Sequence, residues 1–172
     1  MSFGFLPGYL SNITLSYNVS ITRSETYIIG SQTIATSETT IVRNKPVISS
    51  VYHHIAVDLK RESEGQPNLY GNVALGYDVG GFSGRVSVFF QDQYIQSYSQ
   101  DGQSDVYVDP FMKWDLALKQ KLNETFALIL NVNNLTNRQE TTSFKNNVTA
   151  WQIPRTAELY GTTVDFGVRV SL

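Results

Sequence analysis

The stretch 158–172 constrains the fold most, because its second half alternates strictly between apolar and polar side chains. A period of two gives a β-strand one apolar and one wet face. Strands of soluble proteins usually sustain this pattern over only about four to eight residues, whereas here it persists to the last residue. The pattern predicts the closing strand of an outer-membrane β-barrel. The lipid-facing residues of this strand would be Val164, Phe166, Val168, Val170 and Leu172.

Five earlier segments show the same alternation, at about 13–22, 69–79, 82–94, 112–119 and 126–133. Short turns are expected at Gly80-Gly81 and at Leu122-Asn123-Glu124. Polar loops are expected at about 30–67, 97–105 and 134–156, the first with a short strand near 47–57. Outer-membrane barrels alternate short periplasmic turns with longer extracellular loops in this way. We therefore predict an all-β fold, an antiparallel transmembrane β-barrel segment of about six strands.

Composition excludes several other classes of protein. Charged residues make up 16% of the chain, below the roughly 25% of an average soluble domain. A net charge of −2 without a basic stripe argues against a nucleic-acid partner. No run approaches the ~20 apolar residues of a membrane helix. No basic segment of the signal-peptide kind opens the chain, so we expect a C-terminal piece of a longer exported protein.

No residue pattern indicates catalysis. Cysteine is absent, which removes zinc–thiolate sites and cysteine nucleophiles. His53 and His54 are adjacent, and neighbours on a strand point to opposite faces, so regular structure would not direct both at one metal. No G-x-S-x-G, H-E-x-x-H, P-loop or calcium-loop spacing occurs. We expect no enzyme, no cofactor, and no catalytic or metal-binding residue.

Several segments resemble a known family. An apolar strand ends in Asn131-Val-Asn-Asn-Leu-Thr-Asn137, and the last strand reads Tyr160-Gly-Thr-Thr-Val-Asp-Phe-Gly-Val-Arg169. Together these resemble the C-terminal end of a TonB-dependent outer-membrane receptor. Further similar segments are 72–87, Trp114-Asp115 and 6–18. The resemblance covers most of the chain except about 30–67. Leu172 departs from it, because the family usually ends in an aromatic residue.

The resemblance implies the last six strands of a 22-stranded barrel, plugged by an N-terminal domain absent from this sequence. Its function would be energised uptake of a scarce nutrient, such as a ferric siderophore, cobalamin or a glycan, at the outer membrane of a Gram-negative bacterium. The implied partners are outer-membrane lipid, the rest of the barrel and its plug, TonB through the missing N-terminal part, and the barrel-assembly machinery through the C-terminal strand. The isolated chain is not expected to transport.

Two sets of residues are candidates for function. The first set consists of charged side chains on the wet face, which would line the lumen of the barrel. They would form ion pairs within a hydrated wall, contact the plug or contact the substrate. These residues are Arg85, Lys113, Asp115, Lys119, Asp165 and Arg169. Loop residues with aromatic or charged side chains are the better candidates for substrate contact: Tyr98, Asp101, Tyr107, Phe144, Trp151 and Arg155.

Two alternatives remain open. One is a different outer-membrane barrel, structural or adhesin-like, without a plug. The other is a soluble β-sandwich binding module, which also has alternating strands and polar turns. Bulky residues at nearly every lipid-side position weigh against the sandwich. So do the unstructured loops of about twenty to forty residues expected here, which are unusual in a compact domain.

Overall fold

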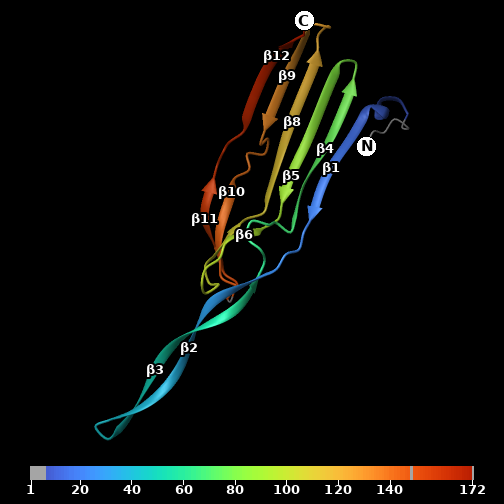
Figure 1. Cartoon of the computed structure of the whole chain (residues 1–172). Coiled ribbons are helices and arrows are strands. Elements are labelled where there is room, and N and C mark those ends of the chain that lie inside the picture. The colour runs from blue at the N-terminus through green and yellow to red at the C-terminus, as the bar shows by residue number, and fades with distance from the viewer. Residues whose placement is uncertain (1–6, 148, 172) are drawn as a thin grey trace.

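The protein is built around one six-stranded antiparallel sheet (Figure 1). The structure, a computed structural model, describes residues 7–147 and 149–171. A short 3₁₀ turn, η1 (Gly8–Asn12), leads into the first strand. The sheet has the order β1-β4-β5-β8-β9-β12 and contains β1 (Ile13–Ile21), β4 (Leu69–Val79), β5 (Phe82–Gln91), β8 (Phe111–Lys121), β9 (Phe126–Asn133) and β12 (Thr163–Val170). It is open at β1 and β12, so the described residues form no closed barrel.

Short connections lie at one end of this sheet and long ones at the other. β1 begins and β12 ends at the end that carries the two short turns (Figure 1). Gly80 and Gly81 join β4 to β5 with φ of 53° and 85°, the left-handed conformation that two-residue hairpin turns need. Between β8 and β9, the Asn123 side chain accepts hydrogen bonds from the backbone N–H groups of Thr125 and Phe126, at 3.0 and 2.8 Å. Both predicted turns are confirmed.

The pairing register places most apolar residues of the six strands on one face, whereas Phe89, Phe111 and Ile129 lie on the other. One row crosses the whole sheet: Leu15, Leu75, Val86, Leu116, Val132 and Val164. Several of these side chains are open to the surroundings, with 55% of Leu75 and 61% of Val164 exposed. Most buried apolar side chains (Ile95, Val106 and Tyr107 among them) lie in the long connections instead. Among residues 7–147 and 149–171, no protein layer therefore lies over the apolar face of the sheet.

The connection between β1 and β4 corrects the sequence-based prediction. We expected a polar loop at about 30–67 with one short strand. The strand expected near 47–57 is present as part of β3 (Lys45–Arg61), but β3 is longer and pairs along its full length with β2 (Thr26–Val42) as a hairpin. Figure 1 shows this hairpin extending far beyond the rest of the protein. At ~3.3 Å per residue each strand is about 55 Å long.

The hairpin escaped prediction because neither of its faces is buried. Ile29 and Ile48 are 79% and 73% exposed, and polar residues occur on both sides, so no period of two marks the strands. The signals that remain are a high content of Thr, Val and Ile, which favour strands, and the turn. Arg43 and Asn44 have φ of 51° and 61°, as a tight two-residue turn requires.

The two later polar loops also contain strands. β6 (Tyr94–Ser97), β7 (Asp105–Val108), β10 (Glu140–Lys145) and β11 (Gln152–Glu158) form a second sheet in the order β11-β10-β7-β6. The predicted loop at about 134–156 thus contains β10 and most of β11, and only the centre of the one at 97–105 lacks strands. Polar strands without a protected apolar face lack the alternation that sequence analysis detects. The sequence analysis counted long unstructured loops as evidence against a soluble β-sandwich. Because these connections contain strands, that evidence no longer applies.

The strained turn of the β2–β3 hairpin can be relieved. We expect Arg43→Asn with Asn44→Gly to stabilise the hairpin by on the order of 1 kcal/mol, because both positions adopt the left-handed conformation. Amide hydrogen exchange in β2 and β3 should slow by about fivefold. Exchange in β8 and β9 should stay unchanged as a control. Faster exchange in the hairpin would contradict this reading of the turn.

Candidate functional site

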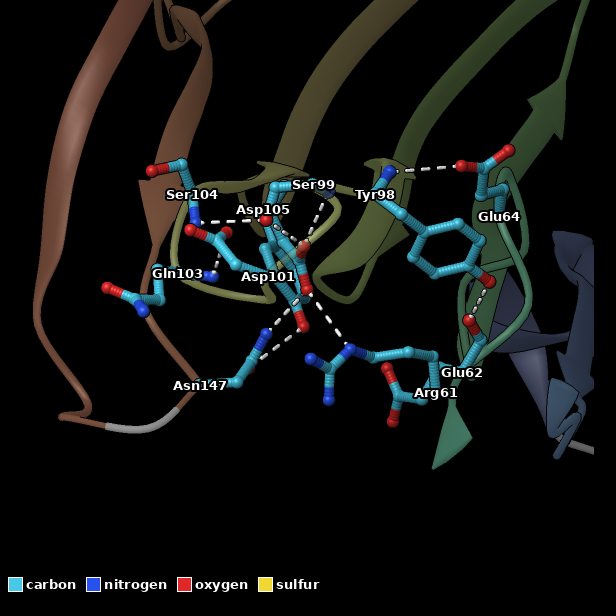
Figure 2. Close-up of polar contacts among 11 residues, drawn as sticks. Arg61, Glu62, Glu64, Tyr98, Ser99, Asp101, Gln103, Ser104, Asp105 and Asn147 are labelled. Atoms are coloured by element: carbon cyan, nitrogen blue, oxygen red, sulfur yellow. Dashed lines mark hydrogen bonds and ion pairs between the residues drawn. The ribbon is translucent and has the colours of Figure 1, made fainter. Parts of the chain in front are cut away.

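The long connections meet at a buried carboxylate, that of Asp105 at the start of β7. Its exposed fraction is 0%. One carboxylate oxygen accepts hydrogen bonds from the backbone N–H and the hydroxyl of Ser99, both at 2.8 Å. The other accepts a hydrogen bond of 2.6 Å from the side-chain amide of Asn147 (Figure 2). These bonds join the β6–β7 loop to the β10–β11 loop.

Arg61, at the end of β3, provides the opposite charge. Its Nε lies 3.4 Å from the Asp105 carboxylate, within ion-pair distance but without hydrogen-bond geometry. The Arg61 side chain is 15% exposed and Asp105 is fully buried, so solvent screens this pair little. A buried carboxylate without compensating donors and charge would be costly. We call Arg61, Ser99, Asp105 and Asn147 the Asp105 clasp, because together they tie three connections to one another.

A second group of contacts fixes the base of the β2–β3 hairpin. The Tyr98 hydroxyl donates to the backbone carbonyl of Glu62, and the Tyr98 N–H donates to the Glu64 carboxylate at 3.0 Å (Figure 2). The N–H of Ser31 donates to the carbonyl of Gln100 at 2.8 Å. A Cβ at Gly30 would lie 2.9 Å from that same carbonyl, so glycine permits the close approach. The hairpin and the β6–β7 loop therefore form one connected unit.

Tyr107 and Lys145 border the clasp. Tyr107 is 6% exposed, and its hydroxyl donates to the side-chain oxygen of Asn147 at 3.3 Å. The Lys145 ammonium lies 4.8 Å from the centre of the Tyr107 ring, a cation–π contact. An open hollow of about 410 Å³ adjoins them, with walls that include Lys60, Arg61, Glu62, Asp92, Gln93 and Lys145. Such walls suit polar ligand groups of either sign.

Burial perturbs two tyrosines at this site. Loss of solvent raises the pKa of the Tyr107 hydroxyl, and the nearby Asp105 charge acts in the same direction. Burial also raises the pKa of Tyr98, with a further contribution from Glu64. Both hydroxyls donate hydrogen bonds to loop acceptors, which requires the protonated form.

The structure separates the six loop residues that the sequence suggested. Tyr98 and Tyr107 lie at the clasp. Asp101 is exposed in the same loop, and its carboxylate accepts a 3.0 Å hydrogen bond from the Gln103 N–H. Phe144 lies beside Val106 in register, on the face of the second sheet opposite to Tyr107. The remaining two are Arg155, whose guanidinium lies 5.5 Å from the centre of the Phe144 ring, and Trp151, which is 39% exposed.

Sequence analysis missed Arg61, Asp105 and Asn147. Each belongs to a different polar connection, and none stands in a recognisable motif. Their proximity depends on how β3, β7 and β10 are placed by the sheets, which no local pattern encodes. The nearest signal was the position of Asp105, the last residue of the predicted polar loop at 97–105 and the first residue of a strand.

The charged residues of the wet face lie on one side of the six-stranded sheet, as predicted. One row runs through Arg85, Ala117, Asn131 and Asp165. Near the long-loop end, the Lys113 ammonium lies 3.7 Å from the Asp115 carboxylate. The described residues thus provide an ion pair at that end of the wall.

Asn134 joins segments that are distant from one another in the sequence. It has a φ of 54°, and its side-chain amide donates to the carbonyls of Arg138 and Gly161 at 3.1 and 3.0 Å. Its backbone N–H donates to the Asp115 carboxylate at 2.8 Å. Its carbonyl accepts from the Thr162 hydroxyl at 2.9 Å. The Asn-Leu-Thr-Asn segment therefore joins the start of β8 to the entry of β12.

The two histidines lie side by side on β3. His53 Nε2 is 3.1 Å from the Thr36 hydroxyl, and His54 Nδ1 is 3.0 Å from the Thr33 hydroxyl. Within residues 7–147 and 149–171, no three His, Cys, Asp or Glu side chains group as metal ligands would. Over the same part of the chain, no helix has the length and apolar content needed to cross a membrane.

Comparisons with known proteins assign no family. The chain matches no protein-family model, no curated protein and no solved structure. The function is therefore argued from the residues and contacts of the chain itself.

The clasp should control the order of the hairpin base. We expect Asp105→Asn to remove the ion pair to Arg61 and to place an amide N–H₂ against donors, at a cost of about 1–3 kcal/mol. Amide exchange at Ser31 and Gly65 should then accelerate by about tenfold or more. The matched control is Asp101→Asn, an exposed carboxylate in the same loop. Equal exchange in both variants would show that the Asp105 carboxylate does not hold the hairpin.

The raised pKa values of Tyr98 and Tyr107 predict that the stability of the clasp depends on pH. A hydroxyl whose pKa is raised by folding contributes stability below its unfolded pKa of about 10 and loses it as pH rises through the folded value. We therefore expect the clasp to loosen only above about pH 10. In an ultraviolet titration, Tyr107→Phe should remove a phenol that ionises above about pH 10, because burial raises the pKa of Tyr107. A Tyr107→Phe curve that differs from that of the unmodified chain only below about pH 10 would contradict the burial of Tyr107.

Proposed function

We propose that this chain is part of the wall of an outer-membrane β-barrel, the C-terminal segment of a TonB-dependent receptor that takes up a scarce nutrient. One observation carries the proposal. The apolar side chains of six paired strands form a continuous exposed face, whereas the opposite face is polar and charged. Exposed apolar surface on this scale marks contact with a membrane or a large partner.

Strand length supports a membrane. The six strands contain between 8 and 11 residues, close to the about 9–11 that a tilted strand needs to cross a bilayer. Within the sheet the backbone groups hydrogen-bond to neighbouring strands, as the hydrocarbon interior demands. Apolar side chains such as Phe166, 70% exposed, would contact outer-membrane lipid at no desolvation cost.

The edges of the sheet support a larger barrel. β1 and β12 each have a neighbour on one side only. Unpaired backbone groups in hydrocarbon cost several kcal/mol each, so further strands would complete the wall. A receptor of this class supplies such strands, together with a plug and a TonB-contacting segment. The barrel-assembly machinery would then engage the C-terminal strand.

The arrangement of the ends supports uptake from outside. The Asp105 clasp, its adjoining hollow and the long hairpin all lie at the long-loop end, which faces outward in barrels of this kind. Ligands with hydroxyl or charged groups, such as a ferric siderophore, cobalamin or a glycan, would meet the protein there. The Asn134 turn joins the segments that resemble the receptor family.

The two alternative classes of protein, a structural or adhesin-like barrel and a soluble β-sandwich, require different structures. A structural or adhesin-like barrel would share the sheet and the lipid contact but would lack an energised plug. A soluble β-sandwich would require a second sheet packed over the apolar face. None of the described elements covers that face, which favours the barrel.

Opposite faces of β12 provide the test. Val168→Arg on the apolar face should cost about 2–4 kcal/mol near the bilayer midplane, whereas Thr163→Arg on the wet face should cost about 0.5 kcal/mol or less. The free energy of unfolding from lipid vesicles, measured by denaturant titration, would compare the two variants. Equal costs would contradict the assignment of the faces. Recovery of the unmodified chain in the soluble fraction without detergent would favour the sandwich.

A further inference from the structure

The outer edge of β3 is open. β3 pairs only with β2, in a two-stranded sheet, so no strand of residues 7–147 or 149–171 lies along its second edge. The pairing runs from Thr26–Arg61 to Val42–Lys45 without a register shift, so no bulge bends the hairpin. Figure 1 shows the hairpin projecting away from the other two sheets. An edge of this kind presents unpaired backbone N–H and C=O groups to any strand that approaches it.

One hydrogen bond at the base of β2 shows which backbone groups point outward. The Ser31 N–H donates to the Gln100 carbonyl, outside the hairpin, and Ser31 pairs with Ala56. Antiparallel strands alternate between pairs that exchange backbone hydrogen bonds and pairs that do not. The Ser31–Ala56 pair is therefore of the second kind, and so is every second pair towards the turn. The β3 residues that direct backbone groups at the open edge are Ile48, Ser50, Tyr52, His54 and Ala56.

The open edge of β3 has few of the features that keep edge strands from pairing. Proteins protect such edges with charged side chains, bulges or proline. No Asp, Glu, Lys or Arg occurs between Pro46 and Val57, and the one proline stands at the end next to the turn. The valines, isoleucines and tyrosine of this segment favour strands, and Ile48 and Tyr52 are 73% and 67% exposed. We call the segment Pro46–Val57 the β3 edge. At ~3.3 Å per residue it is about 40 Å long.

The outer edge of β2 differs from the β3 edge in two respects. Its base is already occupied, because Ser31 bonds to Gln100. Its free part carries the charged residue Glu38. A charge on an edge strand discourages pairing with another chain. The β3 edge is therefore the more open of the two edges of the hairpin.

We infer that the β3 edge pairs antiparallel with the β3 edge of a second copy of this chain. The resulting sheet has the order β2-β3-β3-β2. An uncharged edge offers nothing to a charged partner, and its complement is a strand of the same composition and length, which a second copy supplies. The contact is twofold symmetric, so it closes as a dimer, and the two outer β2 strands carry Glu38. This surface lies outside the six-stranded sheet, so the inference goes beyond the proposed uptake function.

The size of the contact fits a weak, reversible dimer. A pair centred at Tyr52 places Ile48 opposite Ala56 and Ser50 opposite His54, all with backbone groups directed at the partner. About ten backbone hydrogen bonds then join the copies, close to the ≈ 10 of a typical interface. A contact strip about 40 Å long and about 10 Å high on each copy buries about 800 Å² in total, which is the range of transient complexes.

The first experiment uses single cysteines in the whole chain, folded in neutral detergent micelles. The chain has no cysteine, so each introduced thiol is the sole one. Tyr52→Cys should form a covalent dimer on mild oxidation. The matched control is Ala35→Cys, the cross-strand partner of Tyr52 on β2. In the dimer the two β2 strands lie about 14 Å apart, beyond the ~7 Å reach of a disulfide, so this variant should stay monomeric.

Two results of the cysteine experiment would overturn the inference. One is cross-linking of Ala35→Cys that equals or exceeds that of Tyr52→Cys, which would mean contact through β2 or through random encounters. The other is the absence of a Tyr52→Cys dimer at about 100 μM chain, a concentration at which a specific dimer of micromolar affinity is populated.

The second experiment places charge on one edge or the other. Ser50→Lys with His54→Lys brings lysines of the two copies opposite one another and should weaken dimerisation by about tenfold or more, measured by sedimentation equilibrium. The matched control, Ser37→Lys with Thr33→Lys, changes their cross-strand partners on the same face of the hairpin. Its dimerisation should stay within about threefold of the unmodified chain. Equal weakening by both variants would contradict pairing through the β3 edge.

Discussion

In-register pairing of strands that each alternate with a period of two is the constraint on which the rest of the structure depends. In every strand of the six-stranded sheet, most apolar residues pair with apolar residues of the neighbouring strands. The row of paired residues that contains Leu75 therefore lies on one face of the sheet, and the row that contains Arg85 lies on the other. A shift of one residue in any pairing would place charges among the apolar side chains. The register therefore determines the separation of the apolar face from the polar face.

The long-loop end is held together differently. There the buried apolar side chains of Ile95 and Val106 lie close to the buried carboxylate of Asp105, which gathers donors from segments distant in the sequence. Polar networks of this kind specify geometry because each donor must point at one acceptor. Within the described residues, no layer covers either face of the hairpin beyond the clasp, so its direction depends on contacts at its base.

Charge is distributed unevenly along the wet face. Near the long-loop end Lys113 pairs with Asp115, which also accepts the Asn134 N–H. Near the short-turn end Arg85, Lys119, Lys121 and Arg169 form no ion pair with a carboxylate of the described residues.

The sequence by itself determined the strands and tight turns of the main sheet, because alternation and Gly80-Gly81 are local signals. It indicated only part of β3 and did not determine β2, β10 or β11, whose residues show no clear period of two. It identified Tyr98 and Tyr107 by residue type alone. Only the tertiary structure brought Arg61 to Asp105 and Lys121 to Arg169, because contacts between distant segments follow from strand order and register rather than from local pattern.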